Sequence, residues 1–553
     1  MAAPPLPLPY ELRIGVTGHR TLSNATAVDA AVLGALARIA GVFRNRDNGK
    51  NRDKVDVPLA WTVVSPLAKG ADRIVAHAVL NFTGARLEVI TPLPLDEYRK
   101  DFDTREDLAE FESLVSRADS VHELNAGSDA GDLSGEARDR AYLQAGERVV
   151  DGCEILIAVW DGQPAKRKGG TGEVVGYAQR RGRLVVWIDS NHPEIEPALP
   201  DVVKGLSFGY HQQASFLSDR AIDVDVLDEA VQQEAEALQK VAATAALPAG
   251  ALDLVLASLL PVYVRADRLA VHYQQSYVRA ANAIPYLAAF AVTVAAAQIL
   301  FLPGLYRLAI VEVVSMLAVF GVWRLSRREQ WHEKWLHDRF LAEQLRGAMF
   351  LTLFGHEGER ALTDPLPFYP GPHQWLESVV RNLQQDTAAH AKPLPLKPLQ
   401  TFLGTAWLTD QQSFHGRNTV KKTRRAHKRH RLGGALFGAT LLMAFLHFVG
   451  VGHASHAEVM PVLNAGTWIV FFALTLPAWA AAVHAITTQL ELERIAARSS
   501  QMAQLLEALA HRADHARSED ELRDVSLEAA KLMATESREW WALLSFQELK
   551  LHA

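Results

Sequence analysis

Three glycine-containing loops in the first 190 residues have residue types that could bind an anion. The first is Gly15-Val-Thr-Gly-His-Arg20, which follows an apolar run and precedes an amphipathic one. Glycine lets the backbone approach a phosphate closely, and the free N–H groups at a helix start attract negative charge. The candidate ligand-binding residues here are Gly15, Thr17, Gly18, His19 and Arg20. Because glycine pairs also occur in plain strand–helix turns, this loop alone leaves a purely structural role open.

Two further loops have the same placement, between an apolar strand-like run and a helical stretch. The second contributes Ser65, Gly70 and Asp72, although Asp72 could instead cap the helix. The third has three glycines and a threonine at a helix start, a composition typical of an anion-binding nest. Its candidate residues are Asp161, Gly162, Gly169, Gly170, Thr171, Gly172 and Glu173, with Arg167 and Lys168 adding positive charge.

Alternating strands and helices are expected to bring these loops together. Strand-like runs are predicted at residues 12–17, 59–65, 87–91, 155–160 and 184–188, with amphipathic stretches between them. This alternation predicts an α/β Rossmann-like N-terminal domain whose parallel sheet is covered on both faces. Ligands of such sheets bind at the carboxyl ends of the strands, where all three loops are expected.

The composition limits the classes of function. The 553-residue chain has 57 Lys and Arg against 63 Asp and Glu, a net charge of −6. This balance argues against a nucleic-acid binder with a basic surface throughout. The single cysteine, Cys153, excludes an intrachain disulfide framework and a cysteine-rich zinc site. We predict no metal, no cofactor and no nucleic-acid partner.

The second half of the chain contains four apolar runs. They lie near residues 283–302, 305–323, 432–450 and 466–486, and each approaches the ~20 residues that a membrane-crossing helix needs. We predict an all-α membrane domain with four transmembrane helices. Lys and Arg gather after the second run and before the third, whereas the links within each pair lack them. The positive-inside rule then places both termini and residues 324–431 in the cytoplasm.

Two charged features accompany the apolar runs. Glu312 lies about seven residues inside the second run, where a carboxyl is costly and can line a pore. Alternatively, Glu312 lies at the interface and pairs with Arg307. Residues 417–431 hold eight Lys and Arg and no acid. Orientation of the helix is the favoured explanation for this run, and binding of anionic lipid headgroups is the alternative.

Four motifs of the first half together resemble the SLOG superfamily, the Rossmann-like group that includes DprA-type proteins and LOG phosphoribohydrolases. The motifs are Gly15-Val-Thr-Gly-His-Arg20, Ser65-x-Leu-Ala-x-Gly-Ala-Asp72, Pro92-Leu-Pro-x-x-x-Tyr98-x-x-Asp101-Phe102, and Ala158-Val-Trp-Asp-Gly162 with Gly169-Gly-Thr171. The resemblance covers about residues 10–190. It implies a pocket for a nucleotide or a nucleotide-derived molecule such as an ADP-ribose derivative.

The resemblance also bears on catalysis, because the superfamily contains both glycosidic hydrolases and sensors that only bind. The LOG enzymes carry a PGGxGTxxE loop that ends in a glutamate. Alignment on Gly169, Gly170 and Gly172 places Gly176 at that glutamate and Glu173 three residues earlier. The comparison favours a sensor without catalytic residues and leaves hydrolysis through Glu173 as the alternative.

The second half is similar to a tandem form of the SLATT domain, a two-transmembrane effector found beside SLOG-type sensors in bacterial conflict systems. The matching pieces are residues 335–346, 407–415 and 493–502. The resemblance implies a homo-oligomeric, pore-forming or membrane-disrupting effector of antiviral defence in the bacterial inner membrane. It also implies a separately encoded enzyme that produces the signal. A membrane-tethered nucleotide or NAD-type glycosidase and a regulated transporter are the alternatives.

The predicted organisation has five parts. Residues 1–190 are the SLOG-like domain, 191–280 a helical linker, 281–350 the first two-span unit, 351–400 a Pro-rich cytoplasmic connector, and 401–553 the second two-span unit. The two membrane units form a weak internal repeat. In each, a polar or basic juxtamembrane helix precedes two spans and a charged exit helix follows them.

Overall fold

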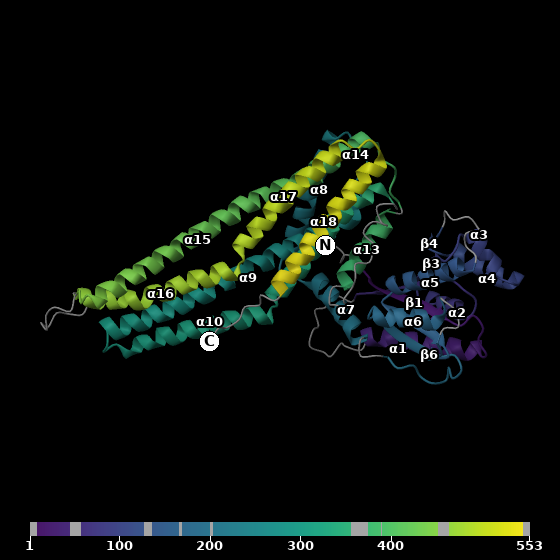
Figure 1. Ribbon diagram of the computed structural model, residues 1–553, viewed down its shortest axis with the longest axis horizontal. Helices are drawn as coiled ribbons and strands as arrows, with labels where there is room; N and C mark the ends of the chain where they lie inside the picture. The colour runs from purple at the N-terminus through teal and green to yellow at the C-terminus, as the bar shows by residue number, and fades with distance from the viewer. Residues whose placement is uncertain are drawn as a thin grey trace. The chain divides into compact units, whose positions relative to one another are not determined.

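The computed structural model describes residues 8–44, 57–125, 135–164, 169–199, 203–355, 374–388, 390–451 and 464–545 (Figure 1). The chain divides into two compact units. Met1–Arg220 and Thr363–Asn382 form the α/β unit, whereas Ala221–Leu362 and Leu383–Ala553 form the helical unit. Arg167, Lys168, residues 356–373 of the predicted Pro-rich connector and residues 452–463 between the third and fourth apolar runs lie outside the described residues.

A six-stranded parallel sheet forms the centre of the α/β unit, in the order β4-β3-β2-β1-β5-β6. The strands are β1 (Tyr10–Gly18), β2 (Leu59–Ser65), β3 (Arg86–Thr91), β4 (Ser120–Glu123), β5 (Ile155–Trp160) and β6 (Leu184–Asp189). The first five residues of β5, all apolar, are fully buried, as a sheet covered on both faces requires. The predicted α/β class with a parallel sheet is confirmed. The sequence did not indicate β4, because this edge strand has one apolar residue, Val121.

Helices connect the strands and cover the sheet. They are α1 (Ala25–Arg44), α2 (Ala71–Leu80), α3 (Leu95–Tyr98), α4 (Arg105–Ser116), α5 (Glu136–Asp151), α6 (Thr171–Arg180) and α7 (Val203–Ser218). Val28, Val32, Leu36 and Ile39 recur at helical spacing along α1 and are fully buried. The hydrophobic face of α1 is therefore part of the core of the α/β unit.

The helical unit consists mostly of long helices. They are α8 (Val224–Thr244), α9 (Asp253–Phe301), α10 (Ala309–Arg328), α11 (Trp331–Leu351), α14 (Leu396–Leu403), α15 (Asp410–Phe448), α16 (Ala465–Gln489), α17 (Leu492–Asp514) and α18 (Glu519–Ser545), while α13 (Gln374–Ala388) belongs in part to each unit. The last part of the predicted helical linker and the first apolar run form one continuous helix, α9, of 49 residues. Likewise, α15 contains the basic run and the third apolar run without a break.

Two helix triplets of the helical unit have the same arrangement. In the first triplet, α9–α10–α11, the exit helix α11 packs back along α9; in the second, α15–α16–α17, α17 packs back along α15. The return begins in both at a residue with left-handed backbone, Gln330 (φ 52°) and Glu491 (φ 45°). These shared features agree with the internal repeat that the sequence suggests.

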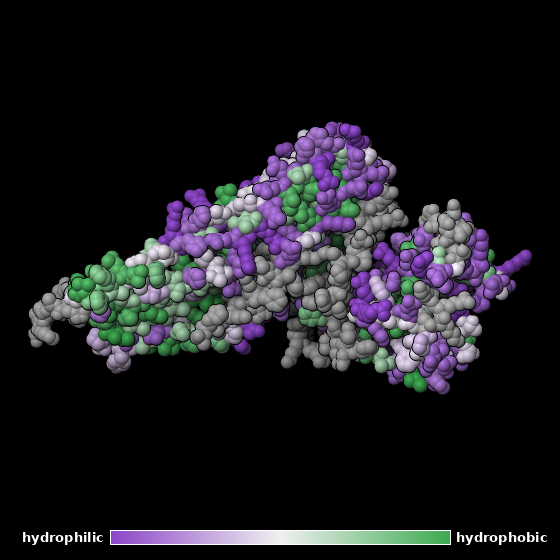
Figure 2. Space-filling view, in the orientation of Figure 1, coloured by the Kyte–Doolittle hydropathy of each residue, from purple (hydrophilic) through white to green (hydrophobic). Residues whose placement is uncertain are grey.

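Within the described residues, five helical segments are long and apolar enough to cross a membrane, judged by length and composition. They are Ala25–Phe43, Asp253–Phe301, Tyr306–Phe354, Leu396–Phe448 and Ala465–Asp514. Four contain the apolar runs of the sequence, and the fifth is α1, so length and composition alone do not establish the predicted number of four. Hydrophobic surface gathers over α10, α15 and α16 (Figure 2), where Phe320, Phe437 and Leu474 are exposed.

Candidate functional site

The loops after β1, β2 and β5 meet at the carboxyl edge of the sheet. The strand order reverses at β1, because β2, β3 and β4 extend the sheet on one side and β5 and β6 on the other, and open α/β sheets bind ligands at such a switch point. The N–H of His19 donates to the carbonyl oxygen of Val159 at 3.0 Å. The carbonyl oxygen of His19 accepts from the N–H of Ala71 at 3.1 Å. Backbone hydrogen bonds therefore connect the first loop to β5 and to the start of α2.

Glycines make this close approach possible. A Cβ atom on Gly70, whose φ is +85°, would lie 2.5 Å from the carbonyl oxygen of Arg20. One on Gly18 would lie 2.4 Å from Cβ of Ala71. Gly15 lies within β1, where a Cβ atom would lie 2.5 Å from Sγ of Cys153. These predicted site residues thus serve the packing of strands, loops and helices, and Gly15 is remote from the edge.

His19 joins the ends of three strands. Its Nε2 lies 3.6 Å from Oδ1 of Asp161, which follows β5, and its Nδ1 lies 3.4 Å from Oγ of Ser190, which follows β6. Thr17 is half-buried near the end of β1, paired with Ala158. The structure therefore brings the predicted residues His19 and Asp161 together and adds Ser190, which the sequence analysis did not single out.

Arg20 is held over an aromatic ring. Its guanidinium lies 5.4 Å from the ring centroid of Tyr142 on α5, and its Nη2 lies 3.7 Å from Oδ2 of Asp101. Asp101 also pairs with Arg138 and accepts from the Tyr142 hydroxyl. The Arg20 side chain stays 50% exposed. A half-exposed cation stacked on a ring and only loosely paired is suited to an incoming anion.

The third loop packs beside the same tyrosine. Gly169 has φ +79°, and a Cβ atom there would lie 2.9 Å from the backbone nitrogen of Leu143 and 3.1 Å from Cβ of Tyr142. Gly170 is the N-cap of α6, and Thr171, Gly172 and Glu173 form its first turn. Oε2 of Glu173 accepts from the N–H of Gly169 at 2.9 Å. Glu173 therefore stabilises the loop locally in this structure.

Other predicted residues have local roles or stand apart. Oγ of Ser65, fully buried, accepts from the N–H of Leu67 at 2.9 Å. Gly162 is exposed, with φ +75°, and faces Trp187. Glu312 is half-buried in the first turn of α10, in the helical unit. An acid at a helix N-terminus is stabilised by the helix dipole. No ion pair joins Glu312 to Arg307 among the described residues.

Asp72 is a buried carboxyl at the start of α2. Burial raises its pKa to about 7, although the N–H of Ala68 donates to Oδ2 at 3.2 Å and the positive charges of Arg20 and Arg73 oppose the shift. The alternative that Asp72 caps the helix is wrong, because Gly70 is the N-cap of α2 and the Asp72 carboxyl instead accepts from Ala68, which precedes the helix. A carboxyl that can hold a proton near neutral pH is also a candidate acid or base.

Tyr98 is a buried residue at this edge that the sequence did not mark as a binding residue. It is 1% exposed, and its hydroxyl has no hydrogen-bond partner among the described residues. Burial raises the pKa of the Tyr98 hydroxyl, and the nearby charge of Asp72 raises it further. A buried hydroxyl without a partner is costly, so such a group points to a ligand or water. Sequence motifs included Tyr98 and Asp101, but no spacing rule could connect them to Arg138 or Tyr142.

We call this group of side chains the edge cluster. It comprises His19, Arg20, Asp72, Tyr98, Asp101, Arg138 and Tyr142. It offers cationic groups, an aromatic face and a buried donor, a combination that can bind an anionic ligand with a planar ring. Among the described residues, no group of three His, Cys, Asp or Glu side chains is placed to hold a metal ion.

Comparison with known proteins gives no relative. No family model, no curated protein and no solved structure matches the chain.

Proposed function

We propose that the chain senses a nucleotide-derived ligand at the edge cluster and passes the signal to a membrane effector formed by the helical unit. The support for a nucleotide is the resemblance of residues 10–190 to SLOG sensors, together with the chemistry of the cluster. Arg20 and Arg138 would bind phosphate, and Tyr142 would offer a ring for stacking. An ADP-ribose derivative or a nucleotide second messenger has both parts.

One observation carries the proposal more than the others. The hydroxyl of Tyr98 is buried beside Asp72 and Arg20, at the edge where the three loops meet, and has no hydrogen-bond partner within the described part of the chain. Removal of this hydroxyl would stabilise the free protein, since an unpartnered buried polar group costs about 1–3 kcal/mol. A costly buried hydroxyl at this edge fits a role in binding.

The helical unit supplies the effector in this proposal. Four apolar segments, in α9, α10, α15 and α16, would span the bacterial inner membrane, and α1 would stay in the core of the α/β unit. The Lys and Arg after α10 and within α15 would place both termini in the cytoplasm. Homo-oligomers of the helical unit would form a pore or disrupt the bilayer, in antiviral defence, on a signal from a separate enzyme.

The coupling between ligand binding and the state of the membrane effector has a thermodynamic limit. The ligand can shift the equilibrium between a closed and an open membrane state only by the difference in its affinity for the two. A 100-fold preference for the open state corresponds to about 2.7 kcal/mol at 25 °C. This is within reach of one or two charge-assisted hydrogen bonds formed in one state alone.

Binding by the purified full chain tests the site. Calorimetric titration with cyclic dinucleotides, ADP-ribose and its derivatives should find one that binds. Arg20→Gln should weaken it about 10- to 100-fold, since a hydrogen bond to a charged group contributes about 1.5–3 kcal/mol. Tyr98→Phe should weaken binding while raising the melting temperature of the free protein. Arg117→Gln, an exposed change at the far end of α4, is the control.

Hydrolysis remains a second candidate because one observation favours it. Asp72, with a pKa of about 7, could exchange a proton with a ligand held by Arg20. Chromatography of the titrated samples separates the two functions. Release of free base or ribose phosphate, lost in Asp72→Asn or Glu173→Gln, would identify a tethered nucleotide or NAD-type glycosidase. Intact ligand after prolonged incubation would support the sensor.

A further inference from the structure

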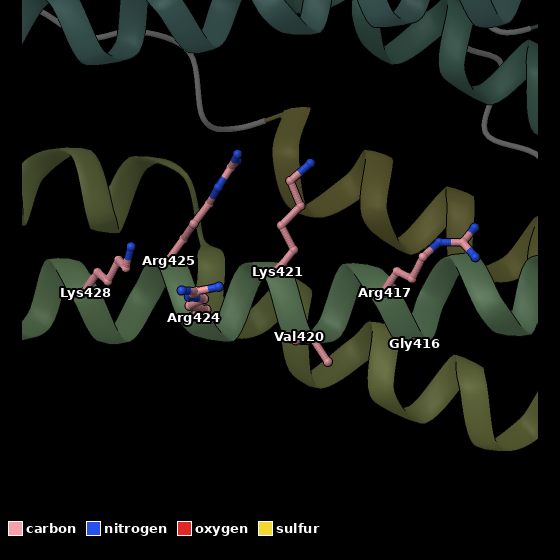
Figure 3. Close-up of a pocket in the computed structure, with 7 residues that line it drawn as sticks. All are labelled: Gly416, Arg417, Val420, Lys421, Arg424, Arg425 and Lys428. Atoms are coloured by element: carbon pink, nitrogen blue, oxygen red, sulfur yellow. The ribbon is translucent and has the colours of Figure 1, made fainter.

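Basic side chains cover one exposed face of α15 just before its apolar run. Arg417, Lys421, Arg424, Arg425 and Lys428 recur at helical spacing and are all exposed. They line an open hollow together with Gly416 and Val420 (Figure 3). Lys421, Arg425 and Lys428 project to the same side of the helix in this view. We call these five cations the basic face.

Most charges of this segment have no acidic partner within the described residues. Only His430 forms an ion pair, with Glu493 at 3.0 Å. The neighbouring exit helix differs, since Arg494 pairs with Glu491, and Arg498 pairs with Glu536 and Glu539. The basic face therefore concentrates positive charge that the described part of the chain does not neutralise.

The buried side of the same segment is also incompletely satisfied. Nη2 of Arg429 donates to Oδ1 of Asn282 on α9 at 3.1 Å, but its Nη1 is buried without a partner among the described residues. Burial lowers the pKa of Lys422, and the charges of Arg425, Lys421 and Arg429 lower it further. Cations that repel each other and leave a donor unused indicate that an anion is missing.

The position of the basic face identifies the kind of anion. The helix continues without a break into the apolar run at 432–450, so Lys428 lies about one turn, and Arg425 about two turns, outside it. Lipid phosphates lie at this depth when the apolar run spans the bilayer. No aromatic side chain lines the hollow, which disfavours single-stranded RNA as the partner.

We propose that the basic face of α15 binds the phosphate groups of anionic membrane lipids. Lys421, Arg425 and Lys428 would contact headgroups from the exposed side, and Nη1 of Arg429 would contact one between α15 and α9. Orientation of α15 and lipid binding are then two effects of one charge cluster. The site is separate from the edge cluster, so its test is independent of nucleotide sensing.

Native mass spectrometry of the full chain in detergent measures lipid binding directly. Phosphatidylglycerol should bind more tightly than phosphatidylcholine. The triple change Lys421→Gln, Arg425→Gln and Lys428→Gln should weaken phosphatidylglycerol binding about fivefold for each charge removed, which corresponds to ~1 kcal/mol per cation near an anionic surface. Phosphatidylcholine binding should not change. Equal phosphatidylglycerol binding by wild type and triple variant would overturn the proposal.

Two control variants separate local charge from other effects. The charge-conserving change Lys421→Arg, Arg425→Lys and Lys428→Arg should keep the lipid preference. Removal of three exposed cations elsewhere, by Arg105→Gln, Arg117→Gln and Lys240→Gln, should keep it too. A loss of preference in this distant variant would contradict a site on α15.

Competition distinguishes membrane lipid from soluble anions. Inorganic phosphate, triphosphate or a uridine oligomer, added at matched ionic strength, should not displace phosphatidylglycerol. Displacement by any of them would assign the basic face to a soluble partner and overturn the lipid proposal. If the triple variant fails to insert into the membrane, the salt dependence of lipid binding by the wild-type protein still tests the proposal. Its preference for phosphatidylglycerol should fall as salt rises, and a preference independent of salt would contradict electrostatic binding.

Discussion

The two helix triplets of the helical unit share a backbone plan and differ in their electrostatics. Both have a long helix, a second apolar helix, a left-handed residue and an exit helix that packs back on the first. In the first triplet, Arg339 and Arg346 of α11 pair with Glu343, and Arg339 also pairs with Asp267 of α9. In the second, the long helix carries the unneutralised basic face. A repeated fold therefore does not require repeated charge, and the two triplets can have different partners.

Arg346 shows how these charges of the first triplet are paired. Its Nη1 donates to Glu343 at 2.6 Å and to Gln411 of α15 at 3.0 Å, and its Nη2 donates to the hydroxyl of Tyr263 on α9 at 2.8 Å. Arg339 pairs with Glu343 and, at 3.4 Å, with Asp267. One buried network thus connects α9, α11 and α15.

The largest expected effect comes from breaking this network. Arg346→Met should lower the free energy of unfolding by about 3–5 kcal/mol, because it leaves Glu343 buried with fewer partners. Arg425→Met, the matched change on the basic face, should alter it by less than ~0.5 kcal/mol, since Arg425 is exposed and has no acidic partner among the described residues. Denaturant unfolding of both variants in detergent provides the measurement. Similar losses in both would remove the distinction between the triplets.

A smaller, pH-dependent effect is expected at Glu536 on α18, which pairs with Arg498 at 3.8 Å. Burial and the charge of Glu343 raise its pKa from 4.5 to about 7. The folded state then holds the proton more tightly than the unfolded chain, so stability should fall as pH rises from about 4.5 to 7.

Glu536→Gln tests this dependence, because glutamine keeps the shape and cannot titrate. The variant should be more stable than wild type at pH 8 by about 2–3 kcal/mol. Its melting temperature should vary less between pH 4.5 and 7. A wild-type melting temperature that rises over this range would contradict the assignment. Glu528→Gln, a change at an exposed acid on the same helix, is the control.

The smallest effects are expected at the two left-handed residues. Gln330→Gly and Glu491→Gly should each stabilise the protein by up to ~1 kcal/mol, because glycine adopts positive φ without a Cβ clash. The left-handed backbone is needed in both triplets, so the two melting temperatures should respond alike. A response at only one position would show that the triplets return by different turns.

The sequence predicted features that neighbouring residues encode, and it did not predict contacts between residues far apart in the chain. The strands β2 and β5 have their predicted bounds, because continuous apolar runs end at glycine or polar residues. The short edge strand β4 was missed for lack of such a run. His19 and Arg20 were found from their loop. Tyr142 and Ser190 were not, since the fold alone brings them to the edge from distant positions.

The helical unit shows the same limit. Four apolar runs were evident from composition, yet the continuity of α9 and α15 was not, because the polar and apolar parts of each helix have different patterns. The network around Arg346 includes a hydrogen bond between residues 83 positions apart and leaves no periodic signal. Turns with positive φ at glutamine and glutamate were equally unforeseeable, since these side chains rarely adopt that backbone.

Ligand-triggered release of dye from liposomes tests the central claim most directly. Full-length protein would be reconstituted and exposed to the nucleotide that binds in solution, with the ligand assayed by chromatography afterwards. The account predicts release by intact ligand that is lost in Arg20→Gln and in Gly170→Arg and kept in Arg117→Gln. Ligand breakdown without release, or release unaffected by Arg20→Gln, would contradict it.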